Sequence, residues 1–128
     1  MYIKKISDYD GYTANVIVTD GTYNLICFYC GYTNGLDKEI HENIEVKEIS
    51  AMFSKNIMRI NKSEYLIQKK YGKGEHFAYY LQGKVLDLTT PLIGIGKLTV
   101  ELDSPLPKDI AQDEFIEFSV DRLDCFLD

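Results

Sequence analysis

Apolar and polar residues alternate along Tyr12–Cys30, which reads YTANVIVTDGTYNLICFYC. In its first half every second residue from Tyr12 to Val18 is apolar, as in a strand that is buried on one face. Asp20 and Gly21 follow, a dipeptide that favours a tight hairpin turn. The residues after this turn are largely apolar on both faces, which indicates a central strand. The stretch therefore predicts a β-hairpin.

Period-two alternation continues along the rest of the chain, and it is clearest in Lys97–Asp103. It predicts further strands at Tyr2–Ser7, Ile44–Phe53, Tyr65–Tyr71, His76–Leu88, Lys97–Asp103 and Glu114–Phe126. Helical periodicity is scarce. We expect at most a turn or two of helix at Leu36–Asn43 and at Ser54–Asn61, and a short turn at Asp109–Asp113 after the Pro105–Pro107 loop.

Two of these predicted strands change the side on which their apolar residues fall. The change occurs around Lys47 and Glu48 in one strand and near Arg122 and Leu123 in the other, and each indicates a β-bulge or a sharp bend. Gly83 lies inside another predicted strand and indicates a further bulge or bend. Long strands with such bends suit a closed or nearly closed barrel. We predict an all-β fold over residues 1–128, a single-domain bent β-barrel or barrel-like sheet with few short helical turns.

The hairpin from Val16 through Asp20 and Gly21 to Phe28 resembles the opening hairpin of OB-fold barrels. The rest of the chain departs from that family, because it has more strand segments than five and no three-turn helix between the third and fourth. The resemblance implies a small β-barrel rather than a particular ligand.

Length and composition favour one soluble domain. A chain of 128 residues forms one hydrophobic core, and its three cysteines, an odd number, fit a reducing compartment. Met1–Asp20 contains acidic and polar residues where a signal peptide needs an apolar stretch, and no run approaches the roughly 20 apolar residues of a membrane span. We expect a cytoplasmic protein with no membrane partner.

The net charge of −6 disfavours non-specific binding to nucleic acid or to anionic membranes. The charge is unevenly distributed along the chain. Residues 55–73 carry a formal +5, with six basic residues against Glu64, and residues 98–128 carry −7, with nine acids against two basic residues. Either each segment merely solvates its own surface, or the surface has two faces of opposite charge.

The acidic segment has two interpretations. Its carboxylates keep the protein soluble, or they form a docking face for a basic protein partner. In the second case the candidate docking residues are Asp109, Asp113, Glu117 and Asp121. Nothing in their spacing selects a particular partner or an oligomeric state.

The basic segment contains interleaved aromatic residues on one predicted hairpin. Cations beside stacking rings are what a surface for single-stranded nucleic acid requires, and the candidate residues here are Lys69, Lys70, Tyr71 and Lys73. However, Phe77, Tyr79 and Leu81 share one side of the strand, which also fits a buried core.

No motif for catalysis, metal or cofactor binding stands out. Cys27 and Cys30 have the spacing of half a zinc site, but on a strand they point to opposite faces, so we expect buried structural thiols and no metal. His41 lies in a polar run, and no motif places a nucleophile beside His76. The sequence favours a non-catalytic binding module with a protein partner. OB-like binding of single-stranded nucleic acid is the alternative, and an enzyme without a recognisable motif is the third class.

Overall fold

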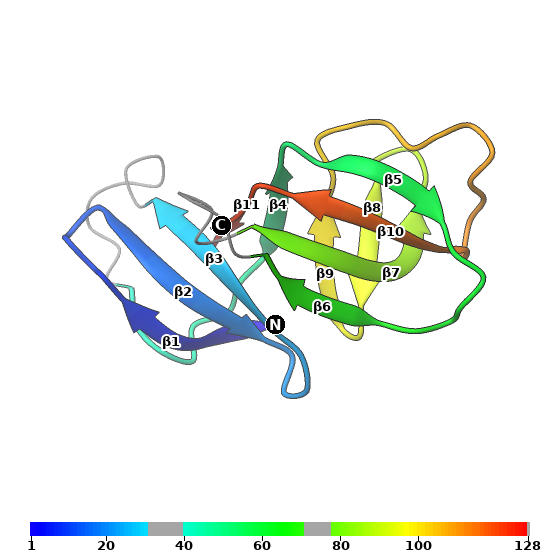
Figure 1. The fold of residues 1–128 in the computed structure, drawn as a ribbon. Helices are drawn as coiled ribbons and strands as arrows, with labels where there is room; N and C mark the ends of the chain where they lie inside the picture. The colour runs from blue at the N-terminus through cyan, green and yellow to red at the C-terminus, as the bar shows by residue number, and fades with distance from the viewer. Residues whose placement is uncertain (31–39, 71–77, 128) are drawn as a thin grey trace.

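A computed structural model describes residues 1–30, 40–70 and 78–127. These residues form eleven β-strands and no helix (Figure 1). In chain order the strands are β1 (Tyr2–Ser7), β2 (Thr13–Thr19), β3 (Asn24–Cys30), β4 (Glu48–Met52), β5 (Lys55–Arg59), β6 (Leu66–Lys69), β7 (Tyr79–Asp87), β8 (Leu92–Ile95), β9 (Leu98–Glu101), β10 (Phe115–Val120) and β11 (Arg122–Phe126). The all-β prediction is confirmed.

All the strands belong to one sheet, in the order β1-β2-β3-β11-β4-β9-β8-β7-β10-β5, with β6 paired to β7 off this path. In Figure 1 strands β1 to β3 form one side of the molecule, β5 to β10 wrap around the other, and β4 and β11 lie between them. The order is an open path from β1 to β5, so the sheet is strongly bent but not closed.

Two long strands bend at the same place. Only Phe53 and Ser54 separate β4 from β5, and only Asp121 separates β10 from β11. Strand β4 pairs with β11, while β5 pairs with β10, so both bends lie on one line across the sheet. The bend predicted near Arg122 is confirmed, because the strand stops at Val120 and resumes at Arg122.

Gly83 lies where the partner of one edge of β7 changes from β6 to β8. Residues 79–82 of that edge pair with β6 and residues 84–87 with β8. A Cβ at Gly83 would lie 2.5 Å from the backbone oxygen of Gly94 and 2.7 Å from the Cγ2 of Ile93. The register of β7 with β10 is nevertheless unbroken at Gly83, and the irregularity in its pairing with β8 lies between Val85 and Asp87, so the bulge predicted at Gly83 is wrong. The close contacts explain why a glycine occupies this position.

The core consists of the inward residues of nearly every strand. Val16 and Val18, which alternate in the predicted hairpin, are fully buried, as are Leu98 and Val100. The Asp20–Gly21 turn is fastened to the β8–β9 turn, because Asp20 accepts hydrogen bonds from the backbone N–H groups of Tyr23 at 2.7 Å and Lys97 at 2.8 Å. One carboxylate thereby joins the two sides of the molecule.

One local prediction is wrong, because Ser54–Asn61 contains strand β5 instead of a helical turn. The short turn predicted at Asp109–Asp113 is present as hydrogen-bonded turns, without a helix. The apolar positions of Ser54–Asn61 fit both periods, and Asn56, at φ 56°, breaks the strand alternation. Most of Leu36–Asn43 lies outside the described residues. Within the described part of the chain, no helix has the length and hydropathy needed to cross a membrane.

Candidate interaction surface

The acidic residues predicted to dock a partner lie beside basic residues of the same chain. Lys55 of β5 contacts Asp121 at 2.9 Å, and Arg59 contacts Asp109 at 3.1 Å and Glu114 at 2.9 Å. The basic and acidic segments meet here because β5 pairs with β10. At Lys55 and Arg59 the basic segment is therefore paired with charges of the acidic segment.

The other two predicted docking acids also have partners within the chain. The carboxylate of Asp113 lies 3.8 Å from the ammonium group of Lys84, and Glu117 accepts a hydrogen bond from the hydroxyl of Tyr80. Gln82 donates a second hydrogen bond to Tyr80 at 2.9 Å. Burial, followed by the bond to Glu117, raises the pKa of Tyr80. A partner of this surface would have to compete with these internal contacts.

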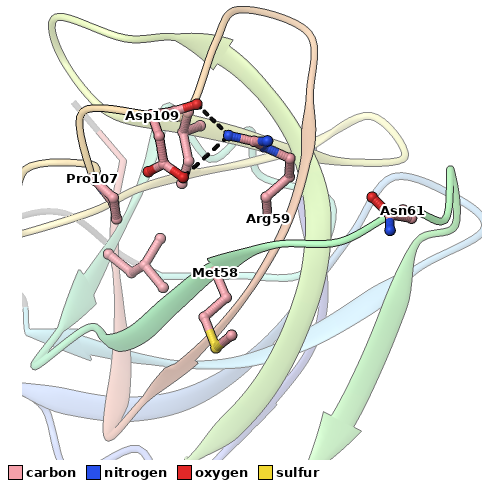
Figure 2. Close-up of a pocket in the computed structure, with 7 residues that line it drawn as sticks. Met58, Arg59, Asn61, Pro107 and Asp109 are labelled. Atoms are coloured by element: carbon pink, nitrogen blue, oxygen red, sulfur yellow. Dashed lines mark hydrogen bonds and ion pairs between the residues drawn. The ribbon is translucent and has the colours of Figure 1, made fainter.

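A cavity of about 330 Å³ lies between β5 and the loop that precedes β10 (Figure 2). Its lining consists of Ile57, Met58, Arg59, Asn61, Pro107, Asp109 and Ile110. Figure 2 shows the guanidinium of Arg59 turned towards Asp109, where it also bonds the backbone oxygen of that residue. Arg59, the basic residue in the lining of this cavity, is therefore already paired with Asp109.

The residues predicted to bind nucleic acid are only partly described. Lys69 and Lys70 lie at the end of β6 and are half-buried, and Tyr71 and Lys73 lie outside the described residues. Tyr79 is buried, as its strand parity predicted, and its hydroxyl accepts a hydrogen bond from the backbone N–H of Ile26 at 2.9 Å. Tyr79 therefore belongs to the core and is closed to a stacking base.

The cysteines lie on both faces of the sheet. Cys27 is buried in the core and Cys30 lies on the opposite face of β3, as predicted, but Cys30 is half-exposed, so the prediction of a buried thiol is wrong for Cys30. Burial raises the pKa of the Cys27 thiol well above its usual range and that of Cys125 to about 12, so both stay protonated at neutral pH.

His41 is exposed, and its Nδ1 lies 2.9 Å from the backbone oxygen of Glu42. His76 lies outside the described residues.

A different surface is formed by the outward side chains of β3, β11, β4 and β9. We call it the outer face. Register places Phe28, Asp124, Ser50 and Glu101 in one row across these four strands. The face comprises Phe28, Cys30, Glu48, Ser50, Met52, Glu101, Arg122, Asp124 and Phe126. It contains two neighbouring cavities.

The first cavity has a volume of about 290 Å³ and lies between β3 and β11. Its lining consists of Phe28, Cys30, Arg122, Asp124, Cys125 and Phe126. The guanidinium of Arg122 lies 4.9 Å from the centre of the Phe28 ring and donates two hydrogen bonds, of 2.6 and 3.0 Å, to Asp124. The stacking on Phe28 and the bidentate ion pair with Asp124 hold the Arg122 side chain in place beside the cavity.

The second cavity, of about 190 Å³, is acidic. Glu48, Ser50, Ala51, Met52, Glu101, Leu102 and Asp103 line it, at the junction of β4 and β9. Glu48 and Glu101 line this cavity together, and Glu48 also accepts a hydrogen bond from the Ser50 hydroxyl at 3.0 Å. Hydrogen bonding to Glu48, followed by burial and the charge of Glu48, raises the pKa of Glu101. Among the ion pairs of the described residues, none includes Glu48 or Glu101.

Asp103 at the edge of this cavity holds the β4–β5 bend. It accepts hydrogen bonds from the backbone N–H of Phe53 at 2.7 Å and of Ser54 at 2.9 Å, and another from the Ser54 hydroxyl. Burial raises the pKa of Asp103, but these hydrogen bonds lower it by more. The contacts hold Phe53 at φ 57° with its side chain 67% exposed. A bulky residue at such a φ is strained.

Sequence reasoning missed the outer face. Its residues occupy alternate outward positions of predicted strands, which is the one signal the sequence carries. Their juxtaposition depends on two parallel pairings, β3 with β11 and β4 with β9, between strands far apart in the chain. No group of three or more His, Cys, Asp or Glu residues in the described ranges is arranged to hold a metal ion.

Comparison with known proteins adds no relative: no protein-family model, curated protein or solved structure matches this chain.

Proposed function

We propose that this protein is a non-catalytic binding module, and that a basic protein partner docks on the outer face. The observation that carries the proposal is that the Glu48 and Glu101 carboxyl groups line one cavity and that neither has a cation among the described ion pairs. The predicted acids Asp109 and Asp121, in contrast, already contact Arg59 and Lys55.

Two adjacent carboxylates repel each other when both are ionised, and an approaching cation removes that repulsion. A Lys or Arg side chain of a partner would therefore gain more at Glu48 and Glu101 than at an acid that already has a cation. Met52 lines the same cavity, and Phe28, Phe126 and Arg122 line the neighbouring one. Aromatic residues, Met and Arg are the types enriched in protein interfaces. Charge and composition thus favour the same face.

The bent sheet suits this role as a rigid scaffold, and we propose that it acts as a barrel-like module in the cytoplasm. The three free thiols support the reducing compartment. Asp109, Asp113, Glu117 and Asp121 remain the second candidate for the docking acids, and Lys69 and Lys70 the candidates for nucleic acid.

The test is affinity capture from the native lysate with three proteins that differ only in side-chain charge. The wild type is compared with Glu48→Gln/Glu101→Gln and with a control of equal charge change, Asp109→Asn/Asp121→Asn. We expect a basic protein to bind the wild type and the control, to be released at high salt, and to be lost from the Glu48→Gln/Glu101→Gln variant. Circular dichroism verifies that all three are folded.

Two results would contradict the proposal. Loss of the partner in the control alone would move the docking site to the β5–β10 surface. Capture of RNA or DNA, sensitive to Lys69→Glu/Lys70→Glu, would favour the nucleic-acid alternative.

A further inference from the structure

The two cavities of the outer face have complementary chemistry. The larger one offers aromatic walls, Phe28 and Phe126, around a volume of about 290 Å³. The smaller one offers the carboxyl groups of Glu48 and Glu101 within about 190 Å³. A ligand that fills both needs an apolar group for the first and a cation for the second.

The spacing between the cavities follows from the sheet. One cavity lies between β3 and β11 and the other between β4 and β9, in the strand order β3-β11-β4-β9. Their centres are two strand intervals apart, which is about 10 Å because neighbouring strands lie about 4.8 Å apart. The row from Phe28 through Asp124 and Ser50 to Glu101 places both at the same level along the strands.

A peptide in the polyproline II conformation has this spacing. It repeats every three residues and rises about 3.1 Å per residue, so side chains i and i+3 point the same way about 9.3 Å apart. In a β-strand the side chains on one face lie about 6.8 or 13.6 Å apart, which fits less well. Aromatic-lined grooves are a known mode of binding for such segments.

The charge of the face restricts the ligand further. Four carboxylates, those of Glu48, Glu101, Asp103 and Asp124, surround the cavities, and the one cation in their linings, Arg122, is already bonded to Asp124. This surplus repels phosphate groups, which argues against nucleic acid and anionic lipid. Arg122 and Phe28 hold each other in place, so the apolar wall is formed before a ligand arrives.

We infer that the outer face binds a polyproline II segment of its protein partner, with an apolar side chain in the Phe28–Phe126 cavity and an Arg or Lys three residues away between Glu48 and Glu101. This inference rests on the proposed function and specifies the partner segment that docks.

The experiment uses synthetic, fluorescently labelled proline-rich peptides of one length, each with one Leu and one Arg. The two residues are two, three or four positions apart, and binding is followed by fluorescence anisotropy. We expect the three-residue spacing to bind at least tenfold more tightly than the others. Replacing Arg by citrulline or Leu by Ser in the peptide should lower affinity at least tenfold, and neither change perturbs the protein.

Variants of the protein test whether Glu48 and Glu101 bind the Arg of the peptide. Glu48→Gln/Glu101→Gln should remove the preference for Arg over citrulline, whereas Asp109→Asn/Asp121→Asn should leave it unchanged. Equal binding at all spacings, equal binding of Arg and citrulline, or no binding of any peptide would overturn the inference. If the peptides fail while capture of the lysate partner still depends on Glu48 and Glu101, the proposed function stands and only the segment is wrong. If both fail, the proposed function fails as well.

Discussion

Gly83 offers a sharp test of the bent sheet, because a single methyl group there meets backbone rather than a flexible side chain. In Gly83→Ala the new Cβ would lie 2.5 Å from the Gly94 oxygen, 2.7 Å from the Ile93 Cγ2 and 3.0 Å from the Ile95 Cγ1. The Gly94 oxygen belongs to the β7–β8 ladder, in which Lys84 and Gly94 are register partners. Moving it disturbs the pairing of both strands.

Overpacking a core costs about 1–3 kcal/mol, and contact with backbone favours the upper end of that range. For a domain of this size 1 kcal/mol corresponds to about 3–6 °C in Tm, so Gly83→Ala should lower Tm by about 10–15 °C. The measurement is thermal unfolding followed by circular dichroism, with urea unfolding as an independent estimate of the free energy of unfolding.

Gly94→Ala is the matched control on the facing strand. The three atoms nearest to its Cβ would all belong to the Leu86 side chain, at 3.0–3.3 Å, and Leu86 is 39% exposed. We expect a change within about 1 kcal/mol for this variant. A Gly83→Ala protein as stable as the wild type, or a Gly94→Ala protein that is less stable than Gly83→Ala, would refute the proposed packing of β7 against β8.

Three further substitutions probe single residues. Phe53→Gly should stabilise the fold by about 0.5–1 kcal/mol, since glycine tolerates the φ of 57° that strains Phe53, and a lower urea midpoint would show instead that the exposed ring packs against the protein. Glu101→Gln should raise stability at pH 7 by about 0.2–1 kcal/mol, as expected for removal of a like-charge pair. The pKa of Glu101 is raised in the folded state, so ionisation opposes folding as pH rises through that pKa, and the gain in Tm should vanish below the ordinary value of 4.5. Asp20→Ala should cost about 1.5–3 kcal/mol through the lost hydrogen bonds of the hairpin turn. Burial raises the pKa of Asp20 but hydrogen bonds lower it by more, so this loss should be full above pH 3.8 and should shrink as pH falls through the lowered pKa. If either Glu101→Gln or Asp20→Ala changed the stability equally at pH 2 and at pH 7, the role given to that carboxylate would be wrong.

Local signals in the sequence predicted most of the strands. The alternation around Val16 and Val18 and the Asp20–Gly21 turn led to β2 and β3, and the loss of alternation near Arg122 led to the break between β10 and β11. These features depend on neighbours in the chain, so a single sequence suffices to find them. Strand β5 was missed because the left-handed Asn56 hides its alternation.

The surface could not be predicted in the same way. The contact of Arg59 with Asp109 requires the pairing of β5 with β10, and the shared cavity of Glu48 and Glu101 requires a parallel pairing of β4 with β9. Strand register between distant segments depends on the whole core, not on local pattern. Sequence reasoning therefore recognised the charged segments but not which charges neutralise one another.

Hydrogen–deuterium exchange of the complex between this protein and its captured partner tests the docking proposal most directly. Docking on the outer face should slow exchange in β3, β4, β9 and β11, because partner contact restrains the opening that exchange requires. Exchange in β6 and in the loop before β10 should stay as in the free protein. Protection confined to β5, β10 and that loop, or to β6, with the outer face unchanged, would contradict the proposal.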